Sequence, residues 1–286
     1  MHGSLETLYF LLFDGFIWGL IIALIALGLS LIFGIMGIIN MAHGDIFMIG
    51  GVLTVVLVAR IGNLWPLLII IPLIVGISAL PVERWILRPY EGKPLTTMIA
   101  TIGISFIIEE ITLIFFGGAA HMVHEPTTFT VHLLGINYPG YNIIAGLVSM
   151  ICILLLWSGL RLTKIGVYIR ATIEEPEMAD AIGINTGQIR SLTFAAGASL
   201  AAFGGVLAAP IHQVSYLMGQ DVILFCFIVV IVGGLGNLMG TLVAAVFLSA
   251  VQEGLSLVFT PVNSNVIILL LMALILVIKP KGMFSS

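Results

Sequence analysis

The sequence predicts an all-α polytopic membrane protein with about eight to nine transmembrane helices, some of them discontinuous. Three observations support this class: a strongly apolar composition, nine apolar runs, and basic residues confined to a few segments. Of the 286 residues, 60% are hydrophobic and only 8% are charged, whereas charged residues make up about 25% of an average soluble domain. So few polar residues cannot cover a soluble surface, which excludes a soluble enzyme, a nucleic-acid-binding protein and a disordered chain.

Apolar runs along the chain are the candidate membrane spans, because a helix needs about 20 mostly apolar residues to cross a bilayer. Two of the runs, residues 46–59 and 222–232, are short and adjoin glycine-rich segments. Short, glycine-interrupted runs in both halves of a chain are typical of discontinuous helices near a transport path. The other runs are residues 13–34, 64–80, 97–116, 141–160, 191–209, 238–256 and 266–278.

Lysine and arginine predict the orientation, because short loops rich in them stay in the cytoplasm. Nine of the ten fall in three clusters, and only Arg60 lies elsewhere. We expect all three clusters and the C-terminus to be cytoplasmic, and the loop of residues 117–140 to be extracytoplasmic. The clusters are Arg84, Arg88 and Lys93; Arg161, Lys164, Arg170 and Arg190; and Lys279 and Lys281.

The loop of about residues 161–190 is the longest charged stretch, and its centre is acidic. Acidic residues around a proline are typical of the first turn of a helix, and a glycine shortly afterwards predicts the end of that helix. The segment is either a docking element for a cytoplasmic partner or a solvated connector. Its candidate docking residues are Arg170, Glu174, Glu175, Pro176, Glu177, Asp180 and Gly183.

Motifs for catalysis are not found in the sequence. The only Gly-Lys pair, Gly92-Lys93, is followed by Pro94, so no phosphate-binding loop precedes a helix. No spacing of Cys and His is typical of a metal site, and no Ser-His-Asp grouping can be argued. We therefore expect no enzymatic activity and no cofactor in this chain.

Acidic residues inside apolar runs are costly in a bilayer and are functional candidates. Glu109 and Glu110 lie past the middle of one run, and Glu253 lies late in another. Because adjacent helical residues cannot face the same way, at least one of Glu109 and Glu110 should face the bundle interior, or both lie near the interface. They form either a proton or substrate relay, or an interhelical hydrogen bond or helix end.

Two glycine-rich breaks provide the candidate substrate path. A break in a membrane helix frees backbone groups that can contact a ligand where it lines a cavity. A structural role in closing the chain break is the alternative. The candidate path residues are Asn40, His43 and Gly44 in the first break, and Gly233, Gly234 and Asn237 in the second.

These segments resemble a known family. ALIALGLSLIFGIMGIINMAHGDIFMIGG (residues 23–51), ERWILRPYEGKPLTTMIATIGIS (83–105) and KIGVYIRATIEEPEMADAIGINTGQIRSLTFAAGASLAAFGGVL (164–207) are similar to signatures of the H-type permease subunits of branched-chain amino acid ABC importers, the LivH family. VVIVGGLGNLMGTLVAA (229–245) and IKPKGMFS (278–285) match the family as well. The matches are in order and cover most of the chain, although residues 117–140 do not match.

The resemblance implies a single permease domain over residues 1–286, with the ABC importer permease fold, in a bacterial or archaeal cytoplasmic membrane. It implies a second, M-type permease subunit, two cytoplasmic ATPase subunits that bind ATP and Mg²⁺, and an extracytoplasmic solute-binding protein. Residues 170–185 would then seat in a groove of the ATPase. The implied solutes are branched-chain or related hydrophobic amino acids, with urea, short-chain amides or aromatic compounds as alternatives. A stand-alone proton-coupled transporter is the further alternative, supported by Glu109 and Glu110.

Overall fold

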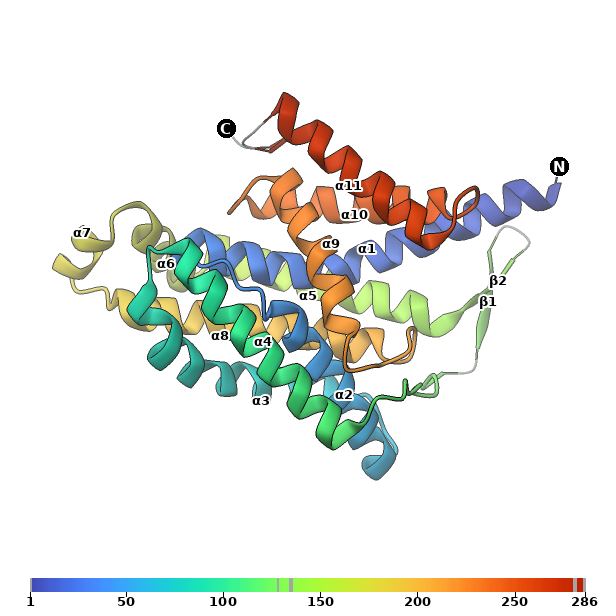
Figure 1. Cartoon of the computed structure of the whole chain (residues 1–286), viewed down its shortest axis with the longest axis horizontal. Helices are drawn as coiled ribbons and strands as arrows, with labels where there is room; N and C mark the ends of the chain where they lie inside the picture. The colour runs from blue at the N-terminus through green and yellow to red at the C-terminus, as the bar shows by residue number, and fades with distance from the viewer. Residues whose placement is uncertain (1, 128, 134–135, 280–281, 285–286) are drawn as a thin grey trace.

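The computed structural model describes residues 2–127, 129–133, 136–279 and 282–284, and shows a bundle of helices (Figure 1). Each of the nine apolar runs forms a helix, so the predicted class is confirmed. Seven of the helices in these residues are long and apolar enough to cross a membrane, and two apolar helices are shorter. The nine helices are α1 (His2–Met36), α2 (His43–Ile61), α3 (Leu67–Pro81), α4 (Pro94–Phe116), α5 (Gly140–Leu162), α8 (Thr186–Ala208), α9 (Met218–Gly233), α10 (Leu238–Leu255) and α11 (Pro261–Ile278).

Shorter elements join these helices. A π-helical segment, η1 (Val82–Leu87), and a 3₁₀ turn, η2 (Arg88–Tyr90), continue α3. The loop of residues 161–190 folds into α6 (Lys164–Glu174) and α7 (Pro176–Ala181). Strands β1 (Thr130–Leu133) and β2 (Ile136–Pro139) pair antiparallel in the loop before α5, a hairpin that the sequence did not predict.

Basic residues gather at one end of the bundle, hereafter the basic end. Hydrogen bonds join Arg88 to Gly187 and Arg190 to Glu91, and one cavity contains Arg161, Arg170 and Asn237. The β-hairpin lies toward the opposite end (Figure 1), where His121 pairs with Val214. The helices alternate in direction, so α1 begins at the opposite end and α11 ends at the basic end. Lys281 lies outside the described residues.

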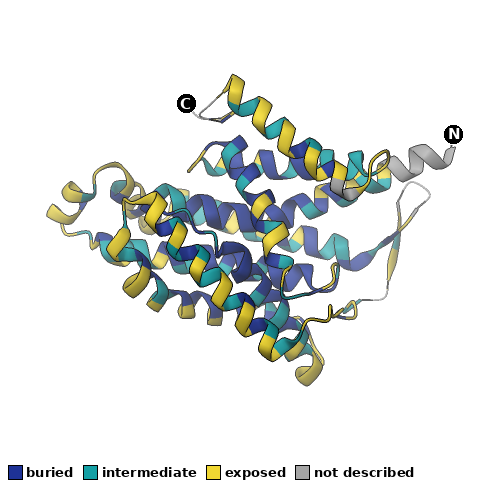
Figure 2. Cartoon of the chain, viewed as in Figure 1, coloured by how far each residue is buried: buried dark blue, intermediate teal, exposed yellow. Residues whose placement is uncertain are grey.

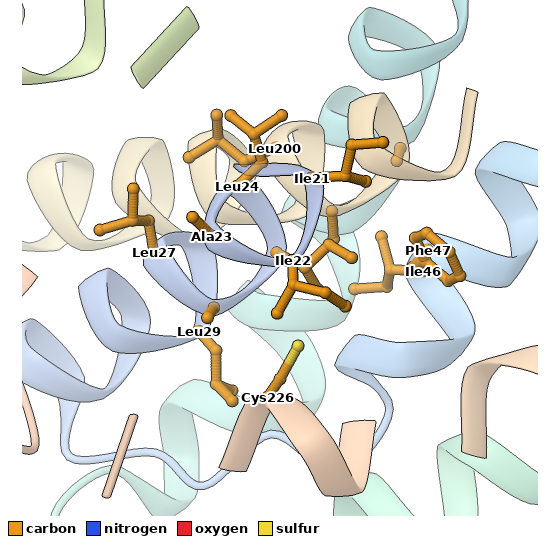
Figure 3. Close-up of a cluster of buried hydrophobic side chains, with 14 of the residues drawn as sticks. Ile21, Ile22, Ala23, Leu24, Leu27, Leu29, Ile46, Phe47, Leu200 and Cys226 are labelled. Carbon is orange, nitrogen blue, oxygen red and sulfur yellow. The ribbon is translucent and has the colours of Figure 1, made fainter. Parts of the chain in front are cut away.

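Helix α1 is the centre of the bundle. It is the most deeply buried of the long helices, with α8 next (Figure 2). Figure 3 shows side chains of α1 surrounded by Phe47 of α2, Leu200 of α8 and Cys226 of α9. In contrast, α4 exposes large apolar side chains along its outer face, such as Ile99, Ile107 and Ile114. An exposed apolar face of this kind suits contact with lipid or with another membrane subunit.

Glycines bring the central helices into backbone contact. A Cβ atom on Gly28 of α1 would lie 2.6 Å from the carbonyl oxygen of Gly197 in α8, and one on Gly44 would lie 2.2 Å from that of Gly219 in α9. A Cβ atom on Gly205 of α8 would likewise lie 2.1 Å from the carbonyl oxygen of Phe47 in α2. Since lipid removes the hydrophobic driving force between helices, such close packing is a main source of their attraction.

Substitution of Gly205 by alanine should therefore destabilise the fold. The new Cβ would overlap the Phe47 carbonyl and force α2 away from α8, at a cost of about 1–3 kcal/mol. Thermal unfolding of the detergent-solubilised protein measures the effect. Gly103→Ala in α4 is the control, because nothing lies within 4 Å of the added Cβ. Equal unfolding temperatures for the two variants would contradict this account of the packing.

Candidate functional site

The break between α1 and α2 lies inside the bundle. The Nε2 atom of His43, the first residue of α2, donates to the carbonyl oxygen of Ile25 at 3.1 Å. Ile25 precedes the last residue of α1, Met36, by 11 residues, which is about 16 Å of helix. Residues 37–42 therefore turn back from the basic end into the membrane interior. The predicted broken segment is present, although α2 is 19 residues long and so long enough to span the bilayer.

Helix α4 stabilises the backbone of this break. The Thr101 hydroxyl donates to the carbonyl oxygen of Ile39 at 3.1 Å and accepts from the backbone N–H of Met41 at 3.0 Å. Unpaired backbone groups are costly at membrane depth, so a non-helical segment needs such partners. The hydroxyl of Thr101 thus supplies one donor and one acceptor to the segment between the two helices.

Two side-chain nitrogens in the break lack a partner among the described residues. Asn40 is 1% exposed and its Nδ2 atom has no hydrogen-bond acceptor, and His43 is fully buried with its Nδ1 atom unbonded. Buried polar atoms nearly always have a partner, so an unpaired one needs an explanation. The Nδ2 donor of Asn40 and the Nδ1 atom of His43 are therefore available to bind a ligand in the break.

The two acidic residues of α4 lie on different sides of the helix. Glu110 is exposed, whereas Glu109 is 6% exposed and accepts a hydrogen bond from the Nε2 atom of Gln220 in α9 at 2.8 Å. The carboxyl of Asp45 in α2, which is 2% exposed, lies against Ser105 and Glu109. Glu109 thus forms the interhelical hydrogen bond considered above, and a second buried carboxyl group lies beside it.

The second group of predicted path residues lies apart from the first. Gly233 contacts the backbone of Gly240, and Gly234 has φ +96°. The Asn237 side chain accepts from the Gly240 N–H at 3.0 Å and donates to the Phe284 carbonyl at 2.6 Å. These contacts form the tight α9–α10 turn at the basic end. Asn237 lines a cavity there, and none of Asn40, His43 and Gly44 is among the residues lining that cavity.

Helix α6 is attached to the end of α5. The Nη1 atom of Arg170 donates to the carbonyl oxygen of Leu160 at 2.6 Å. A Cβ on Gly166 would lie 1.9 Å from that same oxygen, so the two helices meet through their backbones. Thr163 caps α6 by accepting from the Gly166 N–H. The apolar face of α6 packs inward through the buried side chain of Ile169.

Helix α7 begins at Pro176, as the acidic pattern predicted, and ends at Ala181, just before Gly183 with φ +90°. The Asp180 carboxylate accepts from both the backbone N–H and the hydroxyl of Thr186, at 2.9–3.2 Å. This attachment fixes α7 to the start of α8. Glu174, Glu175 and Glu177 are exposed and interleaved with the exposed apolar residues Ile173, Met178 and Ile182.

An ion pair with a buried carboxylate joins the end of α3 to α8. The Glu83 carboxylate, which is 0% exposed, accepts two hydrogen bonds from Arg88, both at 2.9 Å. Arg88 also donates to the Gly187 carbonyl at 3.0 Å and to the Ser191 hydroxyl. The pair thereby ties η1 and η2 to the first turns of α8.

A second ion pair, Arg190–Glu91 at 2.9 Å, reinforces this attachment. Burial raises the pKa of Glu91, and the positive charge of Arg190 opposes that rise.

Sequence reasoning missed Glu83 as a functional candidate, because it lies in a charged segment next to an apolar run. The only sequence signal was that Glu83 and Arg88 are an acid and a base five residues apart. In a regular helix, side chains three or four residues apart are closer to each other than side chains five residues apart.

Polar side chains also meet toward the opposite end. The Tyr138 hydroxyl donates to Asp14 at 2.5 Å, and burial raises the pKa of Tyr138. His212 packs edge-on against Trp18, with ring centres 4.2 Å apart, and burial lowers the pKa of His212. Glu253 is half-buried on α10 and packs against Gly15 of α1. These contacts attach the loops and α10 to the first part of α1.

Comparison with known proteins gives one family. Residues 11–276 match the model of the branched-chain amino acid transport system permease component. The LivH permease protein of the high-affinity branched-chain amino acid transport system of Salmonella typhimurium is 28% identical, covering 99% of this chain and 97% of that protein. The corresponding BraD protein of Pseudomonas aeruginosa is 27% identical over 96% and 94%, and a probable LivH protein of Methanocaldococcus jannaschii is 26% identical over 93% and 89%. No solved structure matches the chain.

Replacement of Thr101 by valine should weaken the break without changing the shape of α4. The variant leaves the Ile39 carbonyl and the Met41 N–H without their partner, which costs about 1–3 kcal/mol. Thermal unfolding measures that loss. Thr112→Val is the matched control, because the Thr112 hydroxyl bonds only to Ile108 of its own helix. Similar losses in both variants would show that Thr101 has no special role at the break.

Proposed function

This chain belongs to the family of branched-chain amino acid transport permease components, and we propose that it is one of two permease subunits of an ATP-driven importer in a bacterial or archaeal cytoplasmic membrane. Its partners would be an M-type permease, two cytoplasmic ATPase subunits that bind ATP and Mg²⁺, and an extracytoplasmic solute-binding protein. The solutes would be branched-chain or related hydrophobic amino acids. Its own chemistry would be transport and not catalysis.

The module formed by α6 and α7 carries this proposal. Its inner side is attached to the bundle by Arg170 and Asp180, while its outer side exposes a mixed acidic and apolar surface at the basic end. An isolated surface of this kind, attached firmly at its base, suits insertion into a groove of a partner protein. Because the sequence lacks a phosphate-binding loop, a separate ATPase is the partner that such a module would need.

Movement of the module would reach the membrane helices through its attachments. Arg170 connects α6 to α5, and Asp180 connects α7 to α8. Arg88 and Glu83 connect α8 in turn to the end of α3. A displacement at the ATPase would therefore shift α3, α5 and α8 together, as in rigid-body transitions of packed helices. Such a shift would alternate the opening of the permease pair between the two sides.

The break between α1 and α2 is the proposed contact for the solute. Asn40 and His43 supply polar atoms that have no partner in the described part of the chain, in a mainly apolar surrounding. Small-molecule sites combine apolar walls with a few polar groups in this way. A hydrophobic amino acid suits that combination better than urea, which would need a narrower and more polar path. Urea, short-chain amides and aromatic compounds stay the alternatives, and direct binding tests with leucine, an aromatic amino acid and urea would separate them.

A stand-alone proton-coupled transporter is the second candidate, and the buried contact between Asp45 and Glu109 favours it. Acidic side chains inside membrane helices are typical of proton pathways. Liposomes that contain this chain alone, with an imposed pH gradient, separate the two candidates. We expect no leucine accumulation without the ATPase subunits and the binding protein, and accumulation by the chain alone would overturn the importer proposal.

Neutralising the acidic surface should weaken ATPase docking. In the assembled importer, we expect Glu174→Gln, Glu175→Gln and Glu177→Gln together to lower the apparent affinity for the ATPase about tenfold, which is about 1.4 kcal/mol. Titration of the ATPase into permease-containing liposomes, read as stimulated ATP hydrolysis, measures this. Glu125→Gln, an exposed acid near the β-hairpin, is the control. Unchanged stimulation in the triple variant would argue against docking at this surface.

A further inference from the structure

A large cavity opens at the basic end of the bundle, next to the α6–α7 module. Its volume is about 610 Å³, and its walls come from α1, α5, α6 and the α9–α10 turn. It is separate from the break between α1 and α2, so the proposed solute contact does not explain it. Two of its lining residues are arginines, Arg161 and Arg170, and none of the described residues that line it is acidic.

The charged part of the cavity is arranged for an anion. The guanidinium carbon of Arg161 lies 4.5 Å from the ring centre of Trp157, a cation–π contact that restrains this long side chain. Arg170 is restrained by its hydrogen bond to Leu160, which uses one of its two Nη atoms. Two restrained guanidinium groups in one cavity favour a ligand with a phosphate or carboxylate group.

The rest of the cavity is apolar. Leu31, Ile35 and Ile169 line its wall. Away from the basic end, α10 exposes Met239, Val243 and Phe247 at four-residue spacing, and α5 exposes Leu154, Ile151 and Leu147. Both helices pack against α1. Both helices that line the cavity therefore also expose apolar side chains farther from the basic end.

We propose that this cavity binds one anionic phospholipid of the cytoplasmic leaflet, with the phosphate between Arg161 and Arg170 and the acyl chains along α5 and α10. Tryptophan and arginine together at a helix end are typical of the membrane interface. Basic pockets between transmembrane helices on the cytoplasmic side bind anionic headgroups. A free phosphate or amino acid would use the arginines but would leave the apolar wall uncovered.

Native mass spectrometry of the purified chain tests the proposal. The protein is exchanged into equal amounts of phosphatidylglycerol and phosphatidylcholine with identical acyl chains, and the retained lipid is counted. We expect about a tenfold preference for phosphatidylglycerol, because the two cations pair with a net negative headgroup. Equal retention of the two lipids would overturn the proposal. The measurement needs no transport partner, so its failure would leave the proposed import function standing.

Variants locate the bound lipid. Arg161→Gln combined with Arg170→Gln should reduce the preference to less than about twofold, since both cations are lost. Arg161→Gln alone keeps the Arg170–Leu160 bond, and it should lower the preference about threefold even if the double variant unfolds. Lys164→Gln is the control, because Lys164 is exposed on α6 and is not among the lining residues. A preference that survives both arginine variants, or that falls equally in the control, would overturn the assignment.

Competition separates a lipid from a free anion. Inorganic phosphate or leucine, added in molar excess over phosphatidylglycerol, should leave the retained lipid unchanged, because neither covers the apolar wall. Complete displacement by phosphate would identify a free-anion site, and displacement by leucine would identify an exit site for the solute. Either result would overturn the lipid assignment.

Discussion

Backbone contact at small residues holds α1 in the centre of this bundle, and the other features depend on it. Gly28 meets Gly197 of α8, Gly19 meets Val246 of α10, and both contacts leave no room for a side chain. In a bilayer, apolar side chains gain little by leaving lipid for a neighbouring helix. Close backbone approach increases the dispersion contact between helices instead. The high glycine content of the sequence, 32 residues, is consistent with this way of packing.

The break between α1 and α2 follows from the same constraint. Residues 37–42 can turn back into the interior only because α2 fits closely against α8 and α9, through Gly44, Gly50 and Gly205. The turn then needs hydrogen-bond partners that lipid cannot give, and α4 supplies them. This helix is apolar toward the outside and buries Thr97, Thr101, Glu109 and Thr112 on its inner side. Its polar stripe is therefore the counterpart of the break, and the two are understood only together.

The sequence predicted the helices well because a bilayer imposes a simple rule on composition and length. Every apolar run became a helix, and the acidic segment after Glu174 became α7 at the predicted proline. Contacts between distant residues could not be predicted in this way. Nothing in the pattern places Asp45 beside Glu109, or Glu83 beside Ser191, because these contacts depend on how α2, α4 and α8 cross. The exact start of α2 was also missed, since the apolar run begins at Ile46 whereas the helix begins at His43.

The attachments at the basic end differ in kind from those in the bundle, and the difference has a mechanical consequence. Inside the bundle, the helices meet mainly through glycine backbone contacts, with hydrogen bonds such as those of His43 with Ile25 and of Gln220 with Glu109 between them. At the basic end, Arg88, Arg170 and Asp180 form directional hydrogen bonds between α3, α5, α6, α7 and α8. In the proposed importer, a displacement of α7 would therefore reach α3, α5 and α8 through these hydrogen bonds. Small sliding movements of packed helices are one of the known types of conformational transition.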